Sequence, residues 1–163
     1  MLKRFIGLAV GALLLGGMYT WARSAARLEG SGPAQIRAAI LDAFQAANQG
    51  RVSEAMGIVS PDYKDSTGLT RDRLWILLRR AADNKQSWTV TARKIVPTAA
   101  AREASVEVIA SVTIDGEAAP RILPLTLSMR LEDTHIWGVI PTQRWRIVST
   151  GGLPDDLLSL GGL

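Results

Sequence analysis

The chain of 163 residues contains no cysteine. This absence excludes disulfides, thiolate metal ligands, a cysteine nucleophile and cysteine-linked lipid anchors. Histidine occurs once, at His135, and aromatic residues make up only 6% of the chain. The sequence also has no glycine-rich phosphate loop, no spacing typical of metal ligands and no serine–histidine–acid arrangement in a supporting context. We therefore expect no cofactor and no bound metal.

The sequence also has no concentrated cluster of charged residues. The formal net charge is +4, and two of the basic residues, Lys3 and Arg4, stand at the start of the chain. Basic and acidic residues nearly balance in the remainder, and the basic ones are scattered rather than clustered. A nucleic-acid partner is therefore not expected.

The chain does have a long apolar run near its beginning. Residues 5–22 carry no charge, and Lys3 and Arg4 precede them. As a helix this run would reach about 27 Å, close to the roughly 30 Å of a bilayer's hydrocarbon core. We interpret it as a membrane anchor that would use Phe5, Ile6, Leu8, Val10, Leu13, Leu14, Leu15, Tyr19 and Trp21.

A cleaved signal peptide is the alternative interpretation of the same run. Residues 5–15 would form its apolar core, and Thr20 to Ala22 or Ser24 to Ala26 would form the cleavage site. Both interpretations carry the following domain out of the cytoplasm. We expect a single-pass membrane protein whose C-terminal domain is periplasmic or extracytoplasmic.

Composition and breaks divide the chain into four parts. Residues 1–28 form the anchor or signal segment and residues 29–33 a short linker. Residues 34–150 form one domain, and residues 151–163 form a tail rich in glycine and leucine.

The first half of the domain has helical periodicity. Ile36, Ile40 and Phe44 lie on one apolar stripe, and Gly50 stands where a C-terminal cap is expected. Ser53 is a plausible N-cap for a short second helix. A third helix is predicted from Arg71 to about Asn84. Its buried positions are expected to be Leu74, Trp75, Leu77, Leu78 and Ala81.

After Gln86 the period changes to two, which indicates strands. They are predicted at residues 88–96, 106–114 and 123–131, and a fourth contains Trp145 and Ile147. Asp115-Gly116 is a turn signal between the second and third strands. Three helices followed by a four-stranded antiparallel meander indicate an α+β fold.

Several segments resemble nuclear transport factor 2-like (SnoaL-like) domains. Residues 40–50 resemble the opening helix of these domains, residues 58–65 the segment after their second helix, and residues 70–74 the start of their third. Residues 144–149 resemble their closing strand, so the resemblance covers about residues 34–150. It implies a cone-shaped domain in which three helices pack on a curved, mainly antiparallel four-stranded sheet.

The resemblance specifies fold better than function. The superfamily contains isomerases, dehydratases, cyclases, ligand binders and many non-catalytic assembly modules. The short segments named above are most similar in sequence to those of bacterial exported members without an assigned activity. Pairing through the open face of the sheet is common in the family that the chain resembles, so a homodimer is an option.

Catalytic members of such families place an aspartate or histidine base in the pocket, with a tyrosine or second acid as donor. Here His135 lies beside Asp133 in what we interpret as a hairpin connection, outside the pocket. Asp62, Tyr63 and Asp65 form the one tight acid–tyrosine cluster before the sheet, and we interpret it as a turn. An enzyme would need Asp62 or Asp65 in an apolar pocket with a raised pKa. We expect no enzymatic activity.

Two segments are candidates for partner binding. The link between the third and fourth predicted strands, Thr134 to Gln143, either extends the strands or forms an exposed apolar tip, which would mark a protein or membrane contact. The tip would contain Ile136, Trp137, Val139 and Ile140. The tail offers Leu157 and Leu158, and it could stay unfolded, pack back on the domain or dock into a partner.

Together these features predict a non-catalytic, membrane-anchored module. We expect it to act as an accessory or stabilising subunit that contacts membrane or periplasmic proteins and the lipid bilayer. Two alternatives stay open at this point. One is an exported domain that binds a small apolar ligand, and the other is an isomerase-like or hydratase-like enzyme that uses Asp62, Tyr63 or Asp65.

Overall fold

The helices precede the strands along the chain, as the sequence predicts. The structure is a computed structural model that describes residues 32–83, 88–116, 118–136 and 140–153. Its elements are α2 (Gly32–Asn48), α3 (Val52–Ala55), the 3-10 helix η1 (Met56–Ile58), α4 (Arg71–Asp83), β1 (Trp88–Ala100), β2 (Glu103–Ile114), β3 (Arg121–Ile136) and β4 (Ile140–Gly151). Residues 32–132 and 145–153 belong to one compact unit, and residues 133–144 belong to another.

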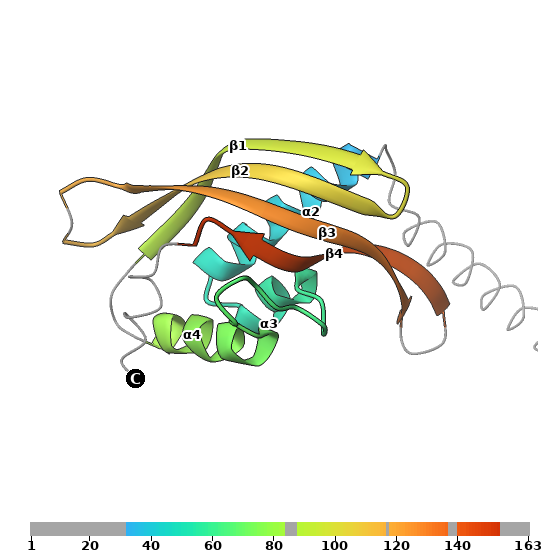
Figure 1. The fold of residues 1–163 in the computed structure, drawn as a ribbon. Helices are drawn as coiled ribbons and strands as arrows, with labels where there is room; N and C mark the ends of the chain where they lie inside the picture. Colours follow the sequence, from blue (N-terminus) through green and yellow to red (C-terminus); the bar gives the residue numbers. More distant parts are fainter. Residues whose placement is uncertain (1–31, 84–87, 117, 137–139, 154–163) are drawn as a thin grey trace, which may run out of the picture. The chain divides into compact units, whose positions relative to one another are not determined.

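The four strands form one sheet in the order β1-β2-β3-β4. The pairs β1–β2 and β2–β3 are antiparallel, and β1 carries a bulge between Ala92 and Lys94. Figure 1 shows the sheet curving across α2. The predicted α+β arrangement of three helices on a curved antiparallel sheet is confirmed.

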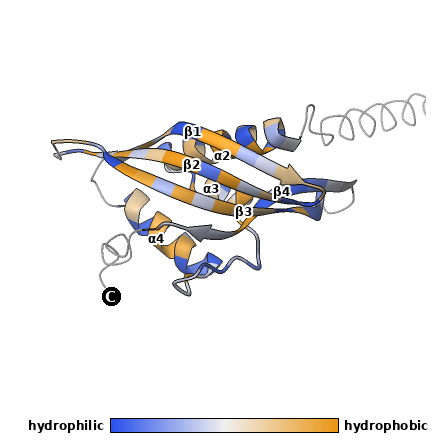
Figure 2. Ribbon diagram, turned by 45° about the horizontal axis from the view of Figure 1, so that its top comes forward, coloured by the Kyte–Doolittle hydropathy of each residue, from blue (hydrophilic) through white to orange (hydrophobic). Residues whose placement is uncertain are grey.

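The two faces of the sheet differ in polarity. On β2, the buried residues Ala104, Val106 and Val108 alternate with the exposed Glu103 and Ser105. Figure 2 shows the same alternation of hydrophobic and hydrophilic residues along the strands. We call the apolar side, which packs on α2, the inner face, and the opposite side the outer face.

The core lies between α2, α3, η1 and the inner face. Its most deeply buried side chains include Ile36 and Ile40 from α2, Met56 from η1, and Val106 and Met129 from the sheet. Burying each aliphatic side chain of this size contributes about 1.5–3 kcal/mol relative to leaving it in water. We call the region around Ile36, Val106 and Met129 the closed end of the core.

The turn between α2 and α3 confirms one predicted helix cap and contradicts another. Gly50 has a φ of +69°, and the amide of Arg51 donates to the carbonyl of Ala46 at 2.9 Å. This geometry confirms the predicted C-terminal cap, since glycine adopts positive φ without steric cost. The prediction of Ser53 as N-cap is wrong, because the chain enters α3 directly at Val52 and Arg51 stands at the cap without a side-chain hydrogen bond.

Helix α4 is less buried than predicted. None of its residues is fully buried, and Trp75, predicted to be in the core, is 43% exposed. Leu74, Leu77 and Leu78 pack against the core at helical spacing. Because each residue advances about 100° around a helix, Trp75 stands at the border of that stripe rather than within it.

The strands are longer than predicted. β1 extends to Ala100, and β2 begins only three residues later at Glu103. β3 reaches Ile136 and β4 starts at Ile140, so both strands extend into the Thr134–Gln143 link. The exposed apolar tip stays a prediction, because residues 137–139 lie outside the described residues. His135 therefore lies in β3 and not in a connection. Between these two strands, the Nε2 atom of Gln143 donates to Oδ1 of Asp133 at 2.8 Å.

Candidate functional site

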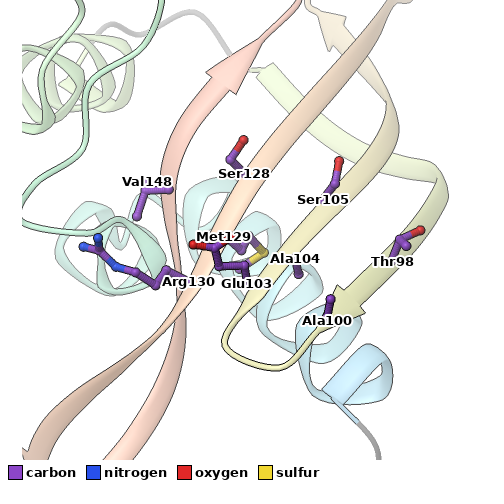
Figure 3. Close-up of a pocket in the computed structure, with 9 residues that line it drawn as sticks. All are labelled: Thr98, Ala100, Glu103, Ala104, Ser105, Ser128, Met129, Arg130 and Val148. Atoms are coloured by element: carbon purple, nitrogen blue, oxygen red, sulfur yellow. The ribbon is translucent and has the colours of Figure 1, made fainter.

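A groove of about 470 Å³ lies on the outer face of the sheet. It is lined by Thr98, Ala100, Glu103, Ala104, Ser105, Ser128, Met129, Arg130 and Val148. Figure 3 shows these residues on the strands, with α2 behind the sheet. The groove is therefore open to the side of the sheet that the helices do not cover.

The sheet register explains why hydroxyl groups gather in the groove. Thr98 pairs with Ser105, and Ser105 pairs with Ser128, so three short polar side chains form one row across β1, β2 and β3. The next row joins Glu103 with Arg130 and adds one charge of each sign. Hydroxyl groups can donate and accept, and such a surface suits contact with polar groups of a partner.

A charged network lies beside the groove, on β3 and β4. The Nη2 atom of Arg130 is 3.0 Å from Oε1 of Glu132 and 3.4 Å from Oδ2 of Asp62. The same Glu132 oxygen accepts a hydrogen bond of 2.7 Å from the hydroxyl of Ser60, which is fully buried. Arg146 approaches the other oxygen of Glu132 at 3.8 Å.

Glu132 is the centre of this network. Burial alone would raise the pKa of Glu132, but the hydrogen bonds from Ser60 and Arg130 and the charges of Arg130 and Arg146 outweigh it. The pKa of Glu132 therefore lies below its ordinary value, and this carboxylate stays ionised at neutral pH. An acid held in this way binds and positions cations, and it is poorly suited to accept a proton.

Within the described residues, part of each edge of the sheet is occupied. On β1, the side-chain amide of Asn48 donates to the carbonyl of Val90 at 2.8 Å and accepts from its amide at 2.7 Å. Arg37 donates to the carbonyl of Ile95 at 3.0 Å. These contacts use backbone groups that an added strand would need.

The edge at β4 is covered by the segment that follows η1. Val59 forms a parallel bridge with Ile147, and the amide of Ser60 donates to the carbonyl of Ile147 at 2.9 Å. The amide of Lys64 donates to the carbonyl of Val148 at 3.1 Å. A partner strand would have to displace these bonds, so the outer face is more accessible to a partner than either edge.

The predicted acid–tyrosine cluster is only partly brought together. The side chain of Asp62 is 80% exposed, as the turn interpretation predicts. Asp65 is buried, and its Oδ1 atom accepts hydrogen bonds from the amides of Thr67 and Leu69 and from the Thr67 hydroxyl. This pattern is that of an aspartate turn, in which the carboxylate stabilises the local backbone.

Tyr63 is buried next to this turn. Burial raises the pKa of Tyr63, a side-chain hydrogen bond with Thr150 lowers it, and the charge of Asp65 raises it further, so the net shift is upward. Tyr63 therefore stays protonated and can donate a hydrogen bond. One atom departs from the simple turn, because Oδ2 of Asp65 is buried without a hydrogen-bond partner among the described groups.

Most of the predicted contact residues lie outside the described residues. These are the anchor positions from Phe5 to Trp21, Trp137 and Val139 of the hairpin, and Leu157 and Leu158 of the tail. Ile136 and Ile140 lie in β3 and β4. Within residues 32–153, apart from the gaps, no helix is long and apolar enough to cross a membrane.

The groove and the network around Glu132 were not predicted from the sequence. The alternation on β3 does predict that Ser128, Arg130 and Glu132 share a face. This alternation could have identified the charged rim of the groove. Nothing in the sequence places Ser60 beside Glu132, 72 positions away. His135 is exposed, and the described part of the chain has no group of three potential metal ligands.

No protein-family model and no curated protein matches the sequence. Solved structures do match. An NTF2-like protein of unknown function from Pseudomonas putida superposes with a TM-score of 0.56 at 12% identity, over 74% of this chain and 85% of that chain. The fold is nuclear transport factor 2-like.

Other structures show how widely this nuclear transport factor 2-like fold is used. A putative scytalone dehydratase from Novosphingobium aromaticivorans matches with a TM-score of 0.52 at 14% identity, over 74% of this chain and 86% of that chain. Bdellovibrio bacteriovorus Bd1075 matches with a TM-score of 0.54 at 10% identity, over 69% of this chain but only 38% of that chain. At these identities the likeness concerns the fold alone, and function has to be argued from the site.

Proposed function

We propose that this chain is a non-catalytic binding module, held at a membrane by residues 5–22, that acts as an accessory or stabilising subunit of a protein complex. Its domain would lie on the periplasmic or extracytoplasmic side. One observation carries the proposal: part of each described edge of the sheet is occupied, while the outer face has a groove with a charged rim. A folded partner would then meet the face of the sheet.

The groove chemistry favours a polar partner surface. Thr98, Ser105 and Ser128 offer hydroxyl groups, and Glu103 and Arg130 allow matching with charges of either sign. The predicted hairpin residues Trp137 and its neighbours would add an apolar anchor, since tryptophan is enriched among the residues that dominate binding energy. Several weak contacts together with a membrane tether would hold the subunit firmly.

Native membranes that carry the full-length chain provide the test. After gentle solubilisation, complexes are separated by size and the intact mass of the chain is measured. We expect an uncleaved chain inside a larger assembly. A soluble, shortened chain that migrates alone would contradict the proposal.

Variants then test which surface binds. Ser128→Tyr fills the groove, and Trp137→Ser with Ile140→Ser removes the apolar tip, so each should reduce the fraction of chain in the assembly. The matched control is Leu41→Ser with Ile76→Ser, which changes two exposed apolar residues on the helices. Equal loss for the control and the two test variants would show that the proposed surfaces are not specific.

A second candidate is a binding domain for a small apolar ligand. The inner-face residues Val90, Val112 and Leu123 and the α4 residues Leu74 and Leu77 are only partly buried. This incompletely covered apolar surface is the observation that favours a ligand. Equilibrium binding of a fluorescent fatty acid to the purified domain would test it, and absence of saturable binding would reject it.

An enzyme has one observation in its favour, the unpartnered Oδ2 atom of Asp65 near Tyr63. The other oxygen of that carboxylate holds three local hydrogen bonds, and neither residue lines the groove. We infer that Asp65 is structural. Loss of a measured activity in Asp65→Asn with unchanged stability would overturn this inference.

A further inference from the structure

The charges at the groove are not equally available to a partner. Arg130 already has two acidic neighbours, because its Nη2 atom is 3.0 Å from Oε1 of Glu132 and 3.4 Å from Oδ2 of Asp62. Figure 3 shows the Arg130 side chain pointing away from Thr98 and Ser105. The positive charge of Arg130 is therefore largely compensated within the domain, and it adds little to the attraction of a partner.

The carboxylate of Glu103 is in the opposite situation. Glu103 is exposed and lies opposite Arg130 in the register of β2 and β3, yet within the described residues it forms no hydrogen bond and no ion pair. Arg102, its neighbour in the chain, instead donates from Nε and Nη2 to the carbonyl of Leu131 at 3.3 and 3.0 Å. The charge that remains available at the groove is therefore negative.

A second available carboxylate lies on the same strand. Glu107 follows Glu103 by four residues on β2, so both side chains point to the outer face, about 13 Å apart at 3.3 Å per residue. Glu107 is exposed, and it has no ion pair in the part of the chain that the structure describes. Lys94 on β1 pairs with Ile109, on the far side of Glu107 from the groove. The two glutamates therefore form an acidic line that begins in the groove.

Hydroxyl groups surround this acidic line. Ser105 stands between the two glutamates, and Thr98 and Ser128 flank it on the neighbouring strands. A guanidinium has five N–H donors in one plane, more than one carboxylate accepts, and hydroxyl oxygens can accept the others. Ala100 and Val148 add apolar groove surface, against which the aliphatic part of a long basic side chain can pack. The groove therefore suits an arginine side chain in charge, in hydrogen bonding and in polarity.

We propose that the groove binds an arginine-bearing segment of the partner protein. One guanidinium pairs with Glu103 and donates to the neighbouring hydroxyl groups, and a second guanidinium pairs with Glu107. An extended segment presents every second side chain to the same side, so arginines four residues apart match the spacing of the two carboxylates. Arginine fits better than lysine, because its planar fork forms two parallel hydrogen bonds with a carboxylate. This inference rests on the proposed function, since it names the chemistry of the partner at the same groove.

Binding of a short peptide to the full-length chain in detergent tests the proposal. The probe is a fluorescein-labelled peptide of sequence Gly-Arg-Ser-Ser-Ser-Arg-Gly with a C-terminal amide. The control peptide carries citrulline, which has no charge, in place of both arginines. Fluorescence anisotropy should show about tenfold tighter binding of the arginine peptide, as expected when two exposed ion pairs are added. Equal affinities for the two peptides would overturn the proposal.

Variants of the full-length chain locate the binding site. Glu103→Gln and Glu107→Gln should each weaken binding of the arginine peptide about two- to fivefold, as for the loss of an exposed ion pair. The matched control is Asp42→Asn, which removes an exposed carboxylate from α2 and should leave the affinity unchanged. Arg130→Gln should strengthen binding, because Glu132 and Asp62 lose their counter-charge. Weaker binding of the peptide by Arg130→Gln, or equal loss in the control, would contradict the proposed site.

The assembly in native membranes separates this inference from the proposed function. Glu103→Gln with Glu107→Gln should lower the fraction of chain in the assembly, as Ser128→Tyr does. If Ser128→Tyr disrupts the assembly and the glutamine variant leaves it intact, the groove binds a partner of other chemistry and the arginine proposal alone is wrong. If the glutamine variant abolishes only pairing of the chain with itself, a second copy is the occupant, and the arginine proposal is again wrong. Absence of any assembly contradicts the proposed function instead.

Discussion

The closed end of the core is built differently from the part around α4, Val90, Val112 and Leu123, where the apolar residues are only partly buried and which we call the open end. At the closed end, Val106 and Met129 are sealed by α2 and η1, and apolar packing holds the structure. At the open end, α4 has no fully buried residue, and hydrogen bonds fix it: Trp88 to Ala81 and the Asp65 turn that leads to Leu69. The same fold therefore combines a fully buried half with a half whose apolar residues are only partly buried.

This difference has a physical origin. Packing at the closed end comes from residues that alternate strictly along long strands and meet a helix with a regular stripe. At the open end the helix is short, and its stripe of leucines is bordered by Trp75 and by charged residues. Regions with fewer buried apolar contacts open at lower free energy, so the open end should be the more mobile half.

The largest effect is expected from Met129→Ala at the closed end. Removing a fully buried methionine leaves a cavity and should lower the free energy of unfolding by about 2–5 kcal/mol. Leu123→Ala, at the partly buried open end, should cost only about 1–2 kcal/mol, because less buried surface is lost. Urea unfolding of the two variants measures the difference. Equal losses would show that the two ends are packed alike.

A smaller effect is expected from the turn before α4. Asp65→Ala removes the acceptor for the amides of Thr67 and Leu69 and should lower the free energy of unfolding by about 1–3 kcal/mol. Asp62→Ala is the control, since exposed ion pairs such as that with Arg130 contribute about 0–1 kcal/mol. Hydrogen exchange of the α4 amides should show local opening in the first variant alone. Unchanged exchange in both would mean that the turn does not hold α4.

The smallest effect is a pH dependence that comes from Glu132. Because the pKa of Glu132 is lowered on folding, its contribution is present above the ordinary value of 4.5 and is lost as the pH falls through the folded pKa. Unfolding measured from pH 6 to pH 3 should show a loss on the order of 1 kcal/mol that is missing in Glu132→Gln. The exposed Glu107→Gln serves as control. Identical pH profiles for all three proteins would show that Glu132 does not contribute to stability in this way.

Periodicity predicted most of the fold. The helical stripe of Ile36 and Ile40 and the alternation on β3 identify the core, and Gly50 identifies the end of α2. The misplaced Trp75 shows the limit, because a residue at the border of a stripe is buried or exposed according to how its helix is tilted. That tilt depends on tertiary contacts.

The candidate site was less accessible to prediction. Exposed hydroxyl groups on strands are common, and only the register brings Thr98, Ser105 and Ser128 into one row. Asp65 was correctly interpreted as a turn residue, but its burial was not foreseen, because an aspartate with local backbone partners can be buried at small cost. The network of Glu132 depends on Ser60, which only the folded chain brings near.

The contacts of Asn48 and Arg37 with β1 also bear on how the chain folds. They join α2 to residues that follow 42 and 58 positions later, so they form only after α3, α4 and the first strand have been synthesised. Contacts of such sequence separation slow folding, since a long loop must close first. Until then the edge of β1 is bare and can pair with a neighbouring chain. The interval before Asn48 reaches Val90 is therefore a period in which the nascent protein is prone to aggregate.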